Sequence, residues 1–266
     1  MIYLALVLNF ILNLSVFQTY KDTLYQARVF LNRGIRYENN GELVKALEEY
    51  GKAISLDSTF TPALERTNRI LILYGKEDSL ILFYMNKIDM YPDNPVYHYI
   101  YGRLIHDNDL KKTEFLKCIE LDSLYYWGHF GLAELYYEIG NPDSAIIKFK
   151  DAISVNPAII DAHYSLGNLY FEKENYTRAE KEFKKCIMIN PVTIVNSYYK
   201  LALIYEMRDD IEKSINYYNL FMRYAPDAPE VDHIIDVVEY LKFIIDQRNR
   251  NNFFYRLKKR IGELIK

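Results

Sequence analysis

Residues 127–157 read WGHFGLAELYYEIGNPDSAIIKFKDAISVNP, and residues 161–191 read DAHYSLGNLYFEKENYTRAEKEFKKCIMINP. When the two blocks are aligned, each shared feature of the second lies 34 positions after its counterpart in the first. The first block contributes His129, Leu132, Ala133, Tyr136, Ala145, Phe149, Ala152 and Pro157. The second contributes His163, Leu166, Gly167, Tyr170, Ala179, Phe183, Cys186 and Pro191. A fixed period of this length is typical of a helical repeat protein.

Each block predicts two amphipathic helices. Leu132 and Tyr136 begin an apolar stripe at helical spacing, and Ala145, Phe149 and Ala152 form a matching stripe further on. Glycines fall at the fifteenth place of three copies, where we expect the left-handed conformation that ends a helix; they are Gly41, Gly75 and Gly140. Small residues let the paired helices approach closely, and stacked pairs bury one continuous core.

Further copies lie on both sides of these two blocks. One follows a residue late, with Leu201, Tyr205, Tyr218 and Pro226 at the pattern positions. Three precede them: one around Gly34 and Tyr50, a weaker one around Leu64 and Tyr84, and one that starts near Pro95 and lacks about three residues between its halves. The sequence therefore predicts an array of about six copies over residues 27–227.

The spacing of small, aromatic and proline residues resembles that of the tetratricopeptide repeat family. The resemblance covers most of the chain, although no copy carries Trp at the family's usual first pattern position, which His98, His129, His163 and Tyr198 occupy instead. It implies an all-α fold: a right-handed superhelical solenoid of about six helix-turn-helix repeats, closed by a C-terminal capping helix. It also implies a non-enzymatic scaffold that binds a protein or peptide partner in a concave groove.

The resemblance further implies which residues face that groove, at the second, fifth, ninth and twelfth places of each first helix. Carried onto copies that start at residues 95, 126, 160 and 195, these places give Tyr99, Arg103, Trp127, Phe130, Glu134, Tyr137, Tyr164, Asn168, Phe171 and Tyr199. We expect the rings to form a surface for a partner's apolar side chains. The alternative, that several rings pack against neighbouring helices, stays open. Only Asn168 matches the Lys and Asn set with which one branch of the family clamps chaperone tails, so we expect no such clamp.

The two ends of the chain differ from the repeats. Residues 1–17 form an apolar run without a charge, which favours a signal peptide or membrane anchor and hence an extracytoplasmic or membrane-anchored protein. Against this, no basic residue precedes the run and several follow it, so a helix packed on the first repeat is the alternative. Residues 228–247 predict an amphipathic capping helix, with Val231, Ile234, Ile235, Val238, Leu241 and Ile245 on its apolar side.

Residues 248–266 form a basic amphipathic segment, with seven Lys or Arg residues against one Glu. Such a segment suits anionic lipid or an acidic partner, or it simply covers the end of the array. It gives a second functional hypothesis, a membrane-peripheral assembly factor held by the apolar run and the basic tail. Peripheral membrane contact through the termini is part of that hypothesis.

Composition and motifs exclude several classes of protein. The net charge of −3 gives no general attraction to nucleic acid. Two cysteines cannot make a disulfide framework, and Cys118 and Cys186 occupy the same small-residue place two copies apart. Because histidines that recur in phase behave as packing residues do, we expect no metal site and no cofactor. We also expect no catalytic residues, since no nucleophile, zinc or phosphate-loop motif is present.

Overall fold

The computed structural model describes residues 2–264, and it describes side chains for residues 21–251 and for residues 253, 256 and 260. Within that range the chain consists of α-helices joined by short turns, without a β-strand. The prediction of an all-α repeat fold is confirmed. The chain divides into two compact units, Met1–Leu135 and Tyr136–Lys266.

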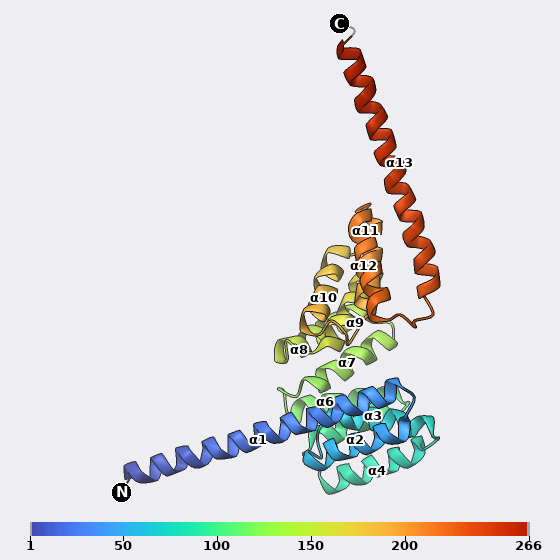
Figure 1. Cartoon of the computed structure of the whole chain (residues 1–266). Helices are drawn as coiled ribbons and strands as arrows, with labels where there is room; N and C mark the ends of the chain where they lie inside the picture. The colour runs from blue at the N-terminus through green and yellow to red at the C-terminus, as the bar shows by residue number, and fades with distance from the viewer. Residues whose placement is uncertain (1, 265–266) are drawn as a thin grey trace. The chain divides into compact units, whose positions relative to one another are not determined.

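The first unit contains six helices among its described residues and most of a seventh. They are α1 (Ile2–Asn39), α2 (Leu43–Leu56), α3 (Thr61–Leu73), α4 (Glu77–Met90), α5 (Pro95–Leu104), α6 (Asn108–Leu121) and α7 (Tyr126–Glu138). Consecutive helices pair as the repeats predict, with α1 packed on α2 and α5 on α6. Figure 1 shows α1 to α4 lying side by side in this unit.

The second unit continues the same pattern. Its helices are α8 (Pro142–Val155), α9 (Ile160–Glu172), α10 (Tyr176–Ile189), α11 (Asn196–Met207), α12 (Ile211–Tyr224) and α13 (Val231–Leu264). Helix α9 packs on α10, α10 on α11 and α11 on α12, and α13 follows as a single long helix (Figure 1). The hand of the superhelix stays a prediction.

In three copies an aromatic ring of the second helix lies directly over a glycine of the first helix, as Tyr50 does over Gly34, Phe115 over Gly102 and Phe183 over Gly167. Phe183 is fully buried, and a Cβ atom added to Gly167 would lie 2.8 Å from its Cε1 atom. Gly34 has the same relation to Tyr50, whose ring would overlap a Cβ atom added to the glycine. Such contacts leave no room for a side chain, so the glycines fix how closely the two helices approach.

Where the aromatic place holds tyrosine instead of phenylalanine, the first helix supplies a polar partner for the hydroxyl group. Tyr50 donates a hydrogen bond to Glu38, and Tyr218 donates one of 2.9 Å to Glu206. The acceptor lies twelve residues before the tyrosine in both copies. The buried hydroxyl is thereby satisfied, as burial of a polar group requires.

The turn between the helices of a copy uses one conformation repeatedly. Gly41, Gly75 and Gly140 have φ angles of +76°, +69° and +76°, which confirms the predicted left-handed glycines. Glu174 and Asp209 occupy the same place in the two later copies, with φ angles of 57° and 59°. A residue with a Cβ atom is strained in this region, so these two turns are less favourable than the glycine turns.

The third copy is shorter because its first helix ends early. Helix α5 has ten residues and stops at Ile105, which adopts an extended conformation with ψ of 157°. Asp107 then caps α6 by accepting a hydrogen bond from the backbone N–H of Leu110 at 2.8 Å. The missing residues therefore remove the left-handed turn, and the chain passes directly between the two helices.

The histidines that recur in phase brace the turns between copies. The Nε2 atoms of His98, His129 and His163 each lie close to the backbone carbonyl oxygen six residues earlier, at 2.8, 3.3 and 3.1 Å. In His98 and His163 the Nδ1 atom also meets a carboxylate of the second helix, Glu114 at 2.6 Å and Glu182 at 2.7 Å. These contacts give the histidines a structural role between loop and helix.

The ends of the chain are continuous with the helices beside them. Residues 2–17 precede the array within one helix, α1, and the side chains of the apolar run lie outside the described residues. The expectation of a signal peptide or anchor, and of the location that follows from it, stays a prediction. Among the described residues, no helix combines the length and the apolar character needed to cross a bilayer.

The expected capping and basic segments form a single helix, α13, instead of two. Ile234, Val238 and Leu241 are buried against α11 and α12. Ile235 is exposed, which differs from the predicted apolar side. Arg248 adds a bidentate ion pair with Asp209 in the α11–α12 turn, at 2.7 and 3.0 Å.

We predict that the aromatic–small contacts carry much of the stability of each copy. Phe149→Ala and Phe183→Ala should each lower the free energy of unfolding by about 3–5 kcal/mol, as buried Phe truncations do. Gly167→Leu should also destabilise, because its side chain would overlap the Phe183 ring. Denaturant unfolding measures all three, and values within about 0.5 kcal/mol of wild type would contradict this account of the core.

The strained turns give a second prediction with an internal control. Glu174→Gly should raise the free energy of unfolding by up to about 1 kcal/mol, because glycine relieves the left-handed strain at some entropic cost. Asp209→Gly relieves the same strain but removes the ion pair with Arg248. We therefore expect a smaller gain or a loss there. Thermal unfolding of both variants tests this, and equal effects would mean that the ion pair adds nothing.

Candidate functional site

The ten residues expected to face a groove fall in the two units, which are described separately. In the first unit three of the aromatic rings are buried. Tyr99 is 0% exposed, Phe130 5% and Trp127 7%. They form one cluster, with centroid distances of 5.6 Å from Tyr99 to Trp127 and 5.5 Å from Trp127 to Phe130. The expectation that Trp127 and Phe130 are accessible to a partner is wrong, because their neighbours cover them.

The polar groups expected in the first unit are engaged with one another. Arg103 forms an ion pair with Glu134, and its Nε atom lies 3.6 Å from Glu65. Tyr99 donates a hydrogen bond to the same Glu65, and burial raises the pKa of the Tyr99 hydroxyl well above its usual range. Arg103 and Glu134, at the ninth places of the third and fourth copies, therefore link the two copies.

The second unit keeps its expected residues closer to the surface. Tyr137 is exposed and donates a hydrogen bond of 2.8 Å to Glu172. Tyr164, Asn168, Phe171 and Tyr199 are half-buried on α9 and α11. This set, on the first helices of its copies, is referred to below as the α9–α11 surface.

The half-buried rings are supported from below by the aromatic place of the second helices. Tyr164 lies 5.8 Å from Phe183, and Tyr199 lies 5.9 Å from Tyr218, between ring centroids. The two tyrosines occupy the same place, 35 residues apart, and they repeat the same contact. Each ring is therefore positioned by the core while part of it remains accessible.

Asn168 has a feature that none of the other nine shares. Its Oδ1 atom is buried, and no hydrogen-bond donor reaches it among the described residues. The other five copies have Ile35, Arg69, Arg103, Glu134 and Leu203 at this ninth place. An unsatisfied buried amide oxygen is costly, and a ligand that donates a hydrogen bond would remove the cost.

A residue that sequence reasoning missed completes this surface. The Lys200 ammonium group lies 4.8 Å from the Phe171 ring centroid, which joins α11 to α9 through a cation–π contact. The equivalent places in the two preceding copies hold Ser165 and Gly131. No periodic signal therefore marks Lys200, and only its contact with the Phe171 ring reveals it as a cation of the α9–α11 surface.

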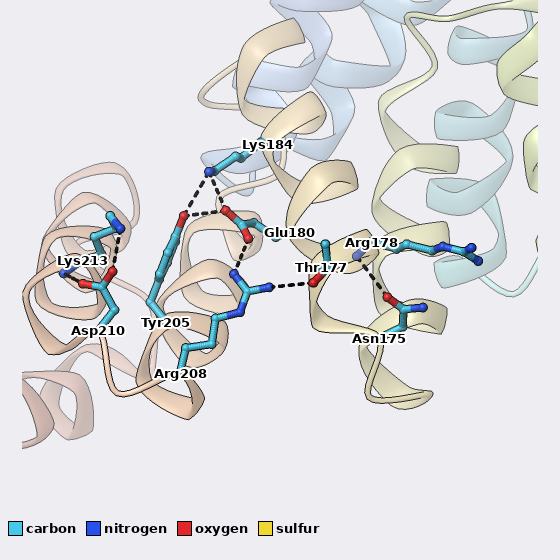
Figure 2. A network of polar contacts seen from close by, with 9 residues as sticks. All are labelled: Asn175, Thr177, Arg178, Glu180, Lys184, Tyr205, Arg208, Asp210 and Lys213. Atoms are coloured by element: carbon cyan, nitrogen blue, oxygen red, sulfur yellow. Dashed lines mark hydrogen bonds and ion pairs between the residues drawn. The ribbon is translucent and has the colours of Figure 1, made fainter.

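A polar network holds α11 against α10 beside this surface. Figure 2 shows Glu180 of α10 at its centre, facing Tyr205 and Arg208 of α11 and Lys184 of its own helix. Glu180 accepts hydrogen bonds from Tyr205 at 2.5 Å, from Lys184 at 2.6 Å and from Arg208. Burial raises the pKa of the Glu180 carboxyl, but these hydrogen bonds outweigh burial and lower that pKa to about 2.

The expectation of no metal site stays a prediction, although the structure supplies one relevant observation. Among the described side chains, no group of three His, Cys, Asp or Glu residues is arranged to hold a metal ion. Both cysteines are buried and unpaired, and burial raises the pKa of the Cys186 thiol to about 12. Neither thiol has the lowered pKa of a reactive cysteine.

Comparison with known proteins agrees with this architecture. Tetratricopeptide repeat family models match residues 160–193 and residues 196–228. No curated protein matches the sequence. Among solved structures, PilW, described as a widely conserved type IV pilus biogenesis factor, has a TM-score of 0.55 at 15% identity over 79% of this chain and 98% of its own.

Two other solved structures are similar at the same level. The pilF protein of Pseudomonas aeruginosa has a TM-score of 0.54 at 14% identity, over 81% of this chain and 99% of its own. MamA has a TM-score of 0.51 at 22% identity, over 58% of this chain and 91% of its own. At such identities the likeness establishes the fold alone.

The fold and the repeat matches together define a helical-repeat protein. Residues 160–193 and 196–228 are tetratricopeptide repeats, and the paired helices of the chain have the fold of a tetratricopeptide-repeat solenoid. Members of the tetratricopeptide repeat family are typically non-enzymatic scaffolds that bind proteins or peptides.

The network around Glu180 generates a prediction about acid stability. Because the folded-state pKa is lowered, this carboxylate stabilises the fold above its unfolded pKa, and the contribution is lost as the pH falls from about 4.5 to about 2. Glu180→Gln should therefore lower stability at neutral pH and flatten the acid limb of the stability curve. Denaturant unfolding at several pH values measures this, and parallel curves for wild type and variant would contradict it.

Proposed function

We propose that the chain is a scaffold that binds a peptide segment of a partner protein on the α9–α11 surface of its second unit. The observation that carries the proposal is the buried, unsatisfied Oδ1 atom of Asn168, which lies among half-buried aromatic side chains. A peptide in extended form offers backbone N–H groups that can donate to this oxygen.

The surrounding side chains fit such a ligand. Tyr164 and Tyr199 combine an apolar ring with a polar hydroxyl group, a combination that is enriched at protein interfaces. Their rings rest on Phe183 and Tyr218, so little side-chain entropy is lost when a partner binds. Lys200, held over Phe171, adds a positive charge that would pair with an acidic side chain of the peptide.

The first unit is not the proposed site, although its sequence matches the same places. Its rings at the fifth place are buried, and the side chains at its ninth place form the Arg103–Glu134 ion pair. A partner would have to break these contacts before it could bind there. The proposal therefore assigns binding to the fifth and sixth copies and a structural role to the third and fourth.

A single substitution separates binding from folding at the proposed site. Asn168→Leu introduces leucine, which the next copy already has at the ninth place as Leu203. We expect stability to stay level or rise, because a buried unsatisfied oxygen is removed. We expect affinity for a peptide to fall about tenfold, or about 1.4 kcal/mol, because the hydrogen-bond acceptor is lost.

The peptide for this test is selected from a displayed random library against the full chain, and its affinity is then measured by titration calorimetry. Tyr164→Ala serves as a second site variant, and Glu134→Leu is the matched control at the ninth place of the preceding copy. Thermal unfolding of each variant accompanies the titrations. Equal affinity of wild type and Asn168→Leu for every selected peptide would overturn the assignment of this surface.

A further inference from the structure

A second feature of the Tyr136–Lys266 unit lies between helices α8, α9 and α10, and none of the residues of the α9–α11 surface lines it. An open hollow of about 340 Å³ is lined by α8, α9, α10 and the turn that precedes α9. Ile153, Pro157 and Leu166 supply its apolar lining, and the buried His163 borders it beside Glu182. A hollow of this size admits one or two side chains of a partner.

Three lysines line the same hollow. Lys150 comes from α8, and Lys181 and Lys185 come from successive turns of α10. The carboxylates close to them in sequence are paired with other groups, Glu180 with Lys184 and Glu182 with His163. Asp151 is paired with Lys148 in the same way, at 2.8 Å. Figure 2 shows Glu180 and Lys184 turned toward Tyr205 of α11.

The three lysines form no ion pair among the described residues. The Lys150 ammonium group makes a cation–π contact, 5.9 Å from the centroid of the Tyr170 ring. The hollow is therefore a local concentration of positive charge in a chain whose net charge is −3. Like charges brought together without a partner repel each other, so the arrangement favours an anionic ligand.

The combination of three lysines occurs once in the array. The same places hold Leu116, Ile147 and Asp151 one copy earlier, and Lys184, Asn216 and Leu220 one copy later. Residues that build a solenoid recur in phase, because each copy must pack on the next. Packing therefore does not require all three lysines together, and their convergence at one hollow calls for another explanation.

We propose that this hollow is a docking site for an acidic segment of a protein partner. An apolar side chain of the segment fills the space over Ile153 and Leu166, and carboxylates on either side of it pair with Lys150, Lys181 and Lys185. Lysine ammonium groups on flexible stems suit such pairing, because they need no fixed geometry. The site is separate from the α9–α11 surface and does not depend on it.

The proposal is tested on the full chain with three synthetic peptides of equal length, each acetylated and amidated. The first has two leucines flanked on each side by two glutamates, the second replaces the glutamates with glutamines, and the third replaces the leucines with serines. We expect binding by the first peptide, at least tenfold weaker binding by the second, and intermediate binding by the third. Affinity for the first should fall as ionic strength rises.

The variant that removes the charge is Lys150→Gln combined with Lys181→Gln and Lys185→Gln. We expect it to bind the first peptide at least tenfold more weakly. The matched control, Lys76→Gln with Lys112→Gln and Lys242→Gln, lowers the net charge equally at exposed positions outside the hollow and should stay within twofold of wild type. Lys185→Asp, which introduces the residue found at this place in the preceding copy, should also lose affinity while it keeps the fold.

Several outcomes would overturn the proposal. Equal losses in the two triple variants would show that only net charge matters, and equal binding of the glutamate and glutamine peptides would show that the lysines are not used. Binding of inorganic phosphate alone, with the same lysine dependence but without affinity for the peptides, would replace the acidic segment with a small phosphorylated ligand. Asn168→Leu should leave the affinity for the first peptide unchanged, which keeps this test independent of the proposed function.

Discussion

The structure depends on the distance between the two helices of a copy, which in three copies is set where an aromatic ring lies directly on a glycine. At Gly167 a single added carbon atom would already be within 2.8 Å of Phe183. This close approach makes both helices of a copy one packing unit. It also supports the tyrosines of the opposite face, since Tyr164 and Tyr199 rest on the same buried rings. Core packing and the presentation of the proposed binding surface are therefore consequences of one contact.

The two units use this common frame differently. In the first, large aromatic side chains on neighbouring helices fill the space beside the fifth place, and the polar residues at the ninth place neutralise each other. In the second, the fifth-place rings stay half-exposed and the ninth place holds an amide oxygen without a donor. The same arrangement of paired helices thus leaves no unsatisfied polar group at the ninth places of the first unit, whereas in the second unit the Asn168 amide oxygen has no donor among the described residues. Only the second arrangement gains from an added ligand.

Periodicity predicts the helices, their pairing and the left-handed glycines, because each of these follows from residue type at a fixed place. It does not predict exposure. Tyr99 and Tyr164 occupy the same place, yet Tyr99 is fully buried because Trp127 and its neighbours are bulky enough to cover it. Lys200 and the combination of three lysines at the hollow were missed for the related reason that neither is repeated along the array. A repeat pattern identifies what all copies need, whereas binding residues are those that single copies do not share.

The way α13 ends the array has a consequence for assembly. Helix pairs stack along one direction, and the last pair of a stack leaves an apolar face uncovered. Another helix pair, from the same chain or from a second molecule, can pack on that face. Ile234, Val238 and Leu241 cover that face on α12, and the bidentate Arg248–Asp209 pair fastens the helix that carries them. Helix α13 therefore prevents a further helix pair from packing on α12. Its detachment would turn a protein of defined length into a template for end-to-end growth.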